Sequence, residues 1–261
     1  MSSPTNGFGA LSGRTAIVTG AGQGVGEGIA RSLAAAGASV VIAARRAETG
    51  EPAAEAIRTR GDDAVCIVTD VTDRASMTEC VAATVDRYGR LDIMVHNAFR
   101  GATPHRVEDL DAELWTQNSR TAVWGSYYSA VLVFPHLVAA APHGRLVLVT
   151  SPSGVEGSVN IPAYSPVKAA QRAMAKSLSK EWGPHGITVN CIAPVAETPA
   201  LTSAFEANPV LKERVEARTS LGRIGDPEAD IGSVVRFLVS DGGAYVTGQT
   251  IVCDGGSFMG L

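Results

Sequence analysis

Short runs of β-branched and apolar residues alternate with longer segments of helical periodicity along most of the chain. The first runs are RTAIVTG, SVVIAAR and AVCIV, and the segment between the last two is rich in Ala and Glu over about 47–60. This alternation predicts βαβ units, in which helices connect neighbouring parallel strands. The runs lack polar alternation, which is typical of strands that are covered on both faces.

The same pattern continues to the end of the chain. Further strands are predicted at 91–97, 145–150, 187–193 and 249–253, and further helices at 74–88, 111–139, 163–182 and 227–240. We therefore predict an α/β fold, with one doubly wound, Rossmann-type parallel sheet of about seven strands and helices on both faces.

No linker, repeat or low-complexity segment divides the 261 residues. We expect a flexible N-terminal leader at 1–12 and a single domain at 13–261. The longest insertion between core elements, 196–222, has apolar residues at roughly helical spacing. Ligands of doubly wound folds bind at the carboxyl ends of the strands, so we expect this insertion to form a substrate lid.

Composition argues against several classes of partner. The formal net charge is -4 and no basic run exceeds Arg45-Arg46, so we expect no nucleic-acid binding. The four cysteines form no C-x-x-C pair and the five histidines have no ligand spacing, so we expect no metal and place the histidines at the surface or at helix ends. We see no secretory signal and no run of 18 apolar residues, and expect a soluble, cytoplasmic protein without membrane contact.

A glycine cluster, TGAGQGVGEG, follows the first predicted strand and leads into an Ala-rich helix. Glycines let the backbone turn tightly and approach a pyrophosphate, and the helix N-terminus favours its negative charge. The strand before the cluster and the helix after it provide the context that a dinucleotide-binding turn requires.

Several short motifs occur in a family-like order. They are Thr19-Gly20-x-x-x-Gly24-x-Gly26, DVTD (70–73), HNA (96–98), LVTS (148–151), YSPVK (164–168) and GITVN (186–190). From Gly13 to the C-terminal VTGQTIVCDGG the chain resembles the short-chain dehydrogenase/reductase superfamily. The resemblance implies an oxidoreductase that transfers a hydride between a nicotinamide cofactor and a small carbonyl or secondary-alcohol substrate. It also implies a homo-oligomer, a tetramer or otherwise a dimer, built on the long helices.

The cofactor choice depends on the end of the second strand. NAD-preferring relatives have an acidic residue there, whereas this chain has Ala44 followed by Arg45 and Arg46. A guanidinium can pair with a 2′-phosphate, so we predict NADP(H) over NAD(H), with Arg45 as the main contact. The alternative is that both arginines belong to a solvated helix start.

Carbonyl reduction requires an acid for the forming alkoxide and a group that polarises the carbonyl. Tyr164 and Lys168 are four residues apart and share a helical face, and Ser151 ends a strand run thirteen residues earlier. The resemblance implies that Ser151 orients the carbonyl and that Tyr164 is the general acid/base. It implies that Lys168 lowers the Tyr164 pKa and holds the nicotinamide ribose.

The resemblance also implies which residues line the cofactor cleft. Asp70 would accept from the adenine amino group, and Thr19 would brace the turn beside Asn97. The full expected cofactor set is Thr19, Gly20, Gly22, Gln23, Gly24, Val25, Gly26, Arg45, Arg46, Asp70, Val71, Asn97, Ala98, Tyr164, Lys168, Pro194, Val195 and Thr198.

Three residues depart from the family pattern. Ala122 replaces an asparagine whose backbone positions a water, Phe99 replaces the glycine of NAG, and Val195 replaces a glycine after Pro194. These departures support a second hypothesis, a dinucleotide-binding redox sensor or assembly partner with little turnover. The intact Ser151 and the Tyr164–Lys168 pair favour the enzyme.

Overall fold

The structure is a computed structural model that describes residues 10–99, 104–159 and 161–258. Seven parallel strands form one sheet in the order β3-β2-β1-β4-β5-β6-β7. All seven predicted strands are present, so the predicted fold class is confirmed. Their bounds are β1 Thr15–Thr19, β2 Ser39–Ala44, β3 Ala64–Val68, β4 Ile93–His96, β5 Arg145–Val149, β6 Thr188–Pro194 and β7 Thr250–Cys253.

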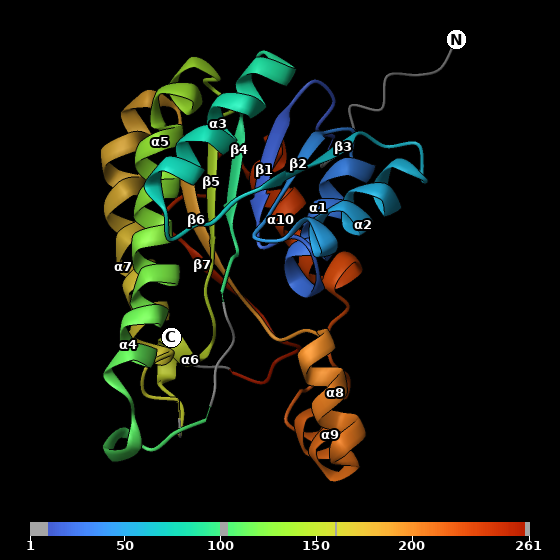
Figure 1. The fold of residues 1–261 in the computed structure, drawn as a ribbon, viewed down its shortest axis with the longest axis vertical. Coiled ribbons are helices and arrows are strands. Elements are labelled where there is room, and N and C mark those ends of the chain that lie inside the picture. The colour runs from blue at the N-terminus through green and yellow to red at the C-terminus, as the bar shows by residue number, and fades with distance from the viewer. Residues whose placement is uncertain (1–9, 100–103, 160, 259–261) are drawn as a thin grey trace.

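Helices cover both faces of this sheet (Figure 1). Their bounds are α1 Gly24–Ala35, α2 Ala47–Arg58, α3 Arg74–Tyr88, α4 Ala112–Ser119, α5 Gly125–Ala139, α6 Ser153–Glu156, α7 Ser165–Trp182, α8 Pro199–Ala207, α9 Pro209–Ala217 and α10 Ser233–Val239. Figure 1 shows α1 and α2 on one side of the sheet and α5 and α7 on the other.

Successive strand residues point into two separate apolar layers, as the period of two in a strand requires. Val18 and Val40 pack with Leu33 of α1 in one layer, whereas Ile17 and Val41 belong to the layer with α3, α5 and α7. This double coverage explains why the strand sequences are apolar throughout.

Two predicted helices begin or continue through π-helical turns. The helix expected over 111–139 consists of α4 and α5 joined by a π-helical turn at Arg120–Trp124. The helix expected over 227–240 starts with a π-helical turn at Pro227–Gly232 and continues as α10. The expected lid contains α8 and α9, which extend beyond the end of the sheet where β6 finishes (Figure 1).

The folded part of the chain starts earlier than the expected boundary at Gly13. Residues 1–9 of the expected leader lie outside the described residues, but Leu11 is fully buried in the first apolar layer. The Leu11 amide also donates to the carbonyl of Ala36 at 2.8 Å.

One helical segment, Ala112–Ala139, is long and apolar enough to cross a membrane by length and composition alone. Core helices of water-soluble proteins pass the same test. Here 39% of the apolar window is buried inside the protein, including Val133 and Leu137 of α5, which are fully buried against the sheet.

Candidate active site

The glycine turn between β1 and α1 has no room for side chains at its first positions. Gly20 has a φ of 64°, and a Cβ there would lie 2.7 Å from the Cα of Ala98. A Cβ at Gly22 would lie 3.0 Å from the backbone of Thr49. Helix α1 starts without a side-chain cap at Gln23, so its first amides stay available for an anion.

Hydrogen bonds lock this turn to the segment after β4. The Thr19 hydroxyl accepts from the amides of Asn97 and Ala98, both at 3.1 Å. The Asn97 side chain donates to the carbonyls of Thr19 and Gly20 at 3.0 and 3.1 Å. The structure therefore brings these four predicted cofactor residues together in one rigid junction.

The histidine prediction is wrong for His96, which is fully buried at the end of β4. Its Nδ1 lies 3.2 Å from the hydroxyls of both Thr19 and Ser129. Burial, reinforced by the charge of Lys168, lowers the His96 pKa to about 3. The side chain faces α5, where a Cβ on Gly125 would come within 2.8 Å of the imidazole. Over the described ranges, no group of three or more His, Cys, Asp or Glu side chains could hold a metal.

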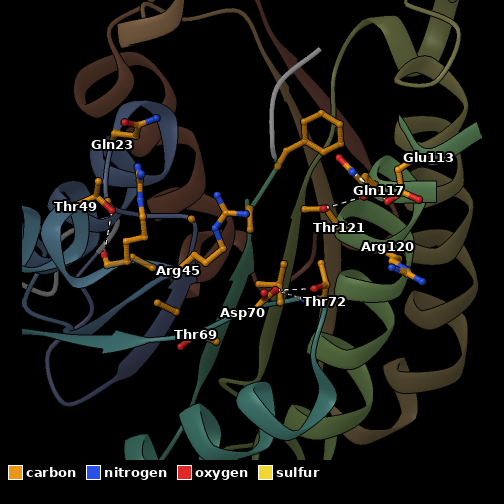
Figure 2. Close-up of a pocket in the computed structure, with 18 residues that line it drawn as sticks. Gln23, Arg45, Thr49, Thr69, Asp70, Thr72, Glu113, Gln117, Arg120 and Thr121 are labelled. Atoms are coloured by element: carbon orange, nitrogen blue, oxygen red, sulfur yellow. Dashed lines mark hydrogen bonds between the residues drawn. The ribbon is translucent and has the colours of Figure 1, made fainter. Parts of the chain in front are cut away.

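A cavity of about 400 Å³ opens beside the glycine turn. Arg45 reaches into it from the end of β2 and Asp70 lies at the end of β3 (Figure 2). The Asp70 Oδ1 accepts from the Thr72 amide and hydroxyl at 2.8 and 2.7 Å, which orients the carboxylate. The predicted cofactor residues that line the cavity are Gly20, Gly22, Gln23, Arg45, Arg46, Asp70, Val71 and Ala98.

The opposite wall of this cavity was missed by sequence reasoning. It is formed by Glu113, Gln117, Arg120 and Thr121 from α4 and the π-helical turn (Figure 2). Their spacing of three to four residues places them on one face of the helix, which is the signal that could have found them.

Ser151, Tyr164 and Lys168 come together where β5 ends. Tyr164 precedes α7, and Lys168 lies one helical turn later with its amide bonded to the Tyr164 carbonyl at 3.1 Å. The Lys168 ammonium donates to the Val149 carbonyl at 2.8 Å and lies 5.7 Å from the centroid of the Tyr164 ring. The exposed fractions of Ser151 and Lys168 are only 8% and 3%.

Burial dominates the protonation behaviour of this pair. It raises the pKa of Tyr164, while a hydrogen bond with Ser151 acts in the opposite direction. It lowers the pKa of Lys168 to about 7. Without substrate, the hydrogen bond with Ser151 therefore favours the tyrosinate. Because the Lys168 pKa is close to neutral, a small change around this side chain alters its charge near neutral pH.

Close packing of α6 on α7 holds Ser151 beside this pair. A Cβ on Gly154 would lie 2.8 Å from the carbonyl carbon and from the Cβ of Lys168. Arg172 donates to the Gly154 carbonyl at 2.8 Å, and the Ser153 amide donates to the Ser151 hydroxyl at 3.2 Å. Only glycine allows α6 to approach the backbone of α7 this closely.

Phe99 lies directly on the Tyr164–Lys168 pair. Its ring centroid is 5.0 Å from that of Tyr164, with an interplanar angle of 68°. The Lys168 ammonium is 4.8 Å from the Phe99 centroid. Phe99 also lines the cavity, so the departure from glycine noted in the sequence places an aromatic ring that contacts both the cavity and the pair.

The π-helical turn contains Ala122, where the family pattern leads us to expect an asparagine. The Ala122 carbonyl accepts from the Ser126 hydroxyl at 2.6 Å and from the Gln171 side chain at 3.4 Å. Gln171 also donates to the Ser126 hydroxyl at 2.8 Å and is fully buried on α7. Sequence reasoning missed Gln171, which ties α7 to the turn.

The remaining predicted residues lie where β6 leads into the lid. The Val195 amide donates to the Cys253 carbonyl at 2.9 Å, next to the end of β6 at Pro194. The Thr198 hydroxyl accepts from the Leu201 amide at 3.3 Å, and its methyl group would lie 3.4 Å from a Cβ on Gly24. Val25 instead packs on the core.

Comparison with known proteins identifies the family. A family model described as Enoyl-(Acyl carrier protein) reductase matches residues 20–257. The chain belongs to the short-chain dehydrogenase/reductase family. Among other short-chain dehydrogenases/reductases, it is similar to L-rhamnose 1-dehydrogenase (NAD(P)(+)) of Azotobacter vinelandii, with 32% identity over 95% of this chain and 98% of that protein.

Other similar family members have equally complete coverage. Oxidoreductase UcpA of Escherichia coli K12 is 36% identical over 97% of both chains. A solved structure from Sinorhizobium meliloti 1021, assigned as a short-chain alcohol dehydrogenase, has a TM-score of 0.89 at 34% identity and covers 96% of this chain and 98% of its own. The protein is accordingly an oxidoreductase that acts on CH–OH or C=O groups with a cofactor of the NAD(P) type.

Proposed function

We propose that this short-chain dehydrogenase/reductase is an NADP(H)-dependent enzyme that interconverts a small carbonyl compound and a secondary alcohol, with Tyr164 as general acid/base. The observation that carries the proposal is the convergence of Ser151, Tyr164 and Lys168 beside a cavity that begins at a glycine turn. When bound, the nicotinamide supplies or accepts the hydride.

The three side chains divide the remaining work. In reduction, the Tyr164 hydroxyl gives its proton to the developing alkoxide, and in oxidation the tyrosinate takes the proton from the alcohol. Ser151 donates to the substrate oxygen and polarises the carbonyl. Burial raises the Tyr164 pKa and the hydrogen bond with Ser151 opposes that rise. In the proposed mechanism the Lys168 ammonium adds a positive charge that stabilises the tyrosinate.

The proposed cofactor residues divide between the lining of the cavity, which holds the adenosine side, and the ends of β5 and β6. Residues of the glycine turn from Thr19 to Gly26 hold the pyrophosphate, and Asp70 and Val71 bind the adenine. Asn97 and Ala98 line the adenosine side, Tyr164 and Lys168 hold the nicotinamide ribose, and Pro194, Val195 and Thr198 contact the nicotinamide.

The arginines after β2 support NADP(H) over NAD(H). Ala44 is buried and has no group that accepts a hydrogen bond from a ribose hydroxyl. Arg45 and Arg46 are exposed and line the cavity, and within the described residues neither forms an ion pair. An unpaired guanidinium is free to bind a phosphate dianion.

A single-turnover experiment tests the proposed function. Enzyme in excess over NADPH is mixed with a panel of aldehydes, cyclic ketones, keto acids and sugar lactones, and loss of NADPH absorbance is followed. We expect oxidation of NADPH with at least one carbonyl class, and its loss in Tyr164→Phe. Tight NADPH binding without oxidation across the whole panel would instead support the sensor or assembly partner, which the names of the relatives do not favour.

We also propose a cytoplasmic homo-oligomer, a tetramer or otherwise a dimer. Trp182 is buried, whereas Trp115 and Trp124 are 44% and 52% exposed. The Trp124 ring lies 5.9 Å from those of Tyr127 and Tyr128, so the α4–α5 helices present an aromatic surface of the kind that oligomers bury. Sedimentation velocity of wild type and Trp124→Glu tests this, since the charge should shift the species towards the monomer.

A further inference from the structure

Phe99 connects two parts of the site that are otherwise built from different elements. It follows Asn97 and Ala98 after β4, and the amides of these two residues are bonded to the Thr19 hydroxyl beside the glycine turn. Its ring reaches both Tyr164, at the start of α7, and Lys168, one turn along that helix. The ring is therefore held from the cofactor side and contacts the proposed acid/base pair.

The Lys168 ammonium is buried and forms one hydrogen bond among the described residues. The group carries three N–H donors, and one of them bonds to the Val149 carbonyl at 2.8 Å. The face of an aromatic ring attracts a cation within about 6 Å of its centroid, and the 4.8 Å separation from Phe99 satisfies this condition. A desolvated cation gains more from such a contact than an exposed one does.

We propose that Phe99 is a positioning residue of the Tyr164–Lys168 pair, which holds the ammonium against its ring and fixes the tyrosine ring by an edge contact. The inference rests on the proposed function for its catalytic meaning. It adds Phe99 to the residues of the proposed function, at a position where the family pattern has a glycine.

The titratable groups around Lys168 do not provide a negative charge that would hold the ammonium in place of the Phe99 ring. The Tyr164 ring, just before α7, lies near the Lys168 ammonium. His96 on β4 and the Cys191 thiol on β6 also interact with it electrostatically. Burial keeps His96 neutral and raises the pKa of Cys191 to about 12, so neither carries a charge near neutral pH. Burial lowers the Lys168 pKa to about 7, and no carboxylate of the described residues opposes this by pairing with the ammonium. Loss of the ring should lower that pKa further.

Lysine NMR tests this directly, because the chain has only four lysines. Protein labelled with ¹³C at the lysine ε carbon is titrated from pH 5.5 to 10, and Lys168→Met assigns the resonance. In wild type we expect an upfield ring-current shift of the Lys168 ε protons and a titration midpoint near neutrality. In Phe99→Leu the ring-current shift should vanish and the midpoint should fall by about 0.4 to 1.5 pH units. Phe99→Tyr, which keeps the ring, should resemble wild type.

Phe134→Leu is the matched control, because that ring packs on Trp182 with centroids 5.0 Å apart. It should leave the Lys168 resonance unchanged. Phe99→Met provides a second variant without a ring if Phe99→Leu does not fold. An unchanged midpoint and proton shift in the folded variants without a ring would overturn the proposal.

The titration requires no substrate, so it separates this inference from the proposed function. If the midpoint moves while no carbonyl is reduced by any variant, the positioning role stands and the proposed activity fails. If NADPH is oxidised and Tyr164→Phe abolishes this, but Phe99→Leu leaves the Lys168 titration unchanged, the activity stands and the positioning role fails.

Discussion

The cavity beside the glycine turn and the reaction centre differ most in their contact with water. Arg45 and Arg46 are exposed at the cavity, whereas Lys168 is 3% exposed and its ammonium lies 4.8 Å from the centroid of the Phe99 ring. Solvent and salt weaken interactions of exposed charges, while burial strengthens electrostatic effects and shifts pKa values. In the proposed function, the choice of cofactor therefore depends on exposed charges, and the chemistry depends on groups whose protonation is set by their packing.

The two regions are joined by the segment after β4. Thr19 and Asn97 fix it on the cavity side, and Phe99 contacts Tyr164 and Lys168 on the other. Variants on either side should accordingly have separate effects unless they disturb this junction.

The largest effect is expected from removal of the buried charge. Lys168→Met should lower the rate of hydride transfer by about 1000-fold, because the tyrosinate loses its stabilising cation. Lys176→Met, on an exposed position of the same helix, is the control and should leave the rate unchanged. The measurement is single-turnover NADPH oxidation at saturating cofactor. Similar rates in the two variants would mean that the ammonium has no role in catalysis.

A smaller effect should follow from pushing α6 away from α7. Gly154→Ala places a methyl group 2.8 Å from the carbonyl carbon of Lys168, and a displacement of Ser151 by even about 1 Å can cost about 100-fold in rate. Gly183→Ala is the matched control, since nothing lies within 4 Å of a Cβ there. Steady-state kcat of both variants, with NADPH affinity measured by fluorescence, checks the prediction. A loss of affinity with unchanged kcat would contradict it.

The buried histidine behind the cavity should make the protein sensitive to acid. The folded-state pKa of His96 is about 3, below its unfolded value, so the unfolded chain binds the additional proton as the pH falls below about 6.5. The free energy of unfolding should therefore be about 2 kcal/mol lower at pH 5 than at pH 7. Urea unfolding at both pH values measures this. His96→Gln, if folded, should lose most of the difference, whereas His185→Gln, at an exposed position, should keep it.

The smallest effect is expected at the exposed arginines. Arg45→Asp should weaken NADPH binding by about tenfold and improve binding of NADH, because one charge-assisted contact with the 2′-phosphate is lost in screened surroundings. Arg46→Asp should change the ratio of the two affinities less. Calorimetric titration with both cofactors decides between the two arginines, and an unchanged ratio in Arg45→Asp would support the alternative of a solvated helix start.

The features predictable from the sequence are those that depend on near neighbours. Buried strands need apolar residues at every position, a tight turn needs glycine, and residues four apart on α7 share a face, so the sheet, the glycine turn and the Tyr164–Lys168 pair could be anticipated. The spacing of Gln117 and Arg120 predicts that they share one helical face. It does not predict that this face lines the cavity, because the packing of the helix decides that.

The features that could not be predicted depend on contacts between distant segments. Phe99 could be recognised as unusual, yet only the course of the chain after β4 shows that its ring lies on Tyr164 and Lys168. His96 was expected at the surface or at a helix end because the histidines have no ligand spacing, whereas the sheet buries it against α5. Gln171 appears in the sequence as an ordinary helical residue until Ser126 and the π-helical turn supply its partners.

One experiment can test whether the cavity determines NADPH affinity while the reaction centre determines the rate. The NADPH dissociation constant and the single-turnover rate at saturating NADPH are determined for wild type, Arg45→Asp and Tyr164→Phe. The account predicts that Arg45→Asp raises the dissociation constant about tenfold with little change in rate. It predicts that Tyr164→Phe lowers the rate by about 1000-fold or more with little change in the dissociation constant. A Tyr164→Phe enzyme that oxidises NADPH at the wild-type rate would contradict the account.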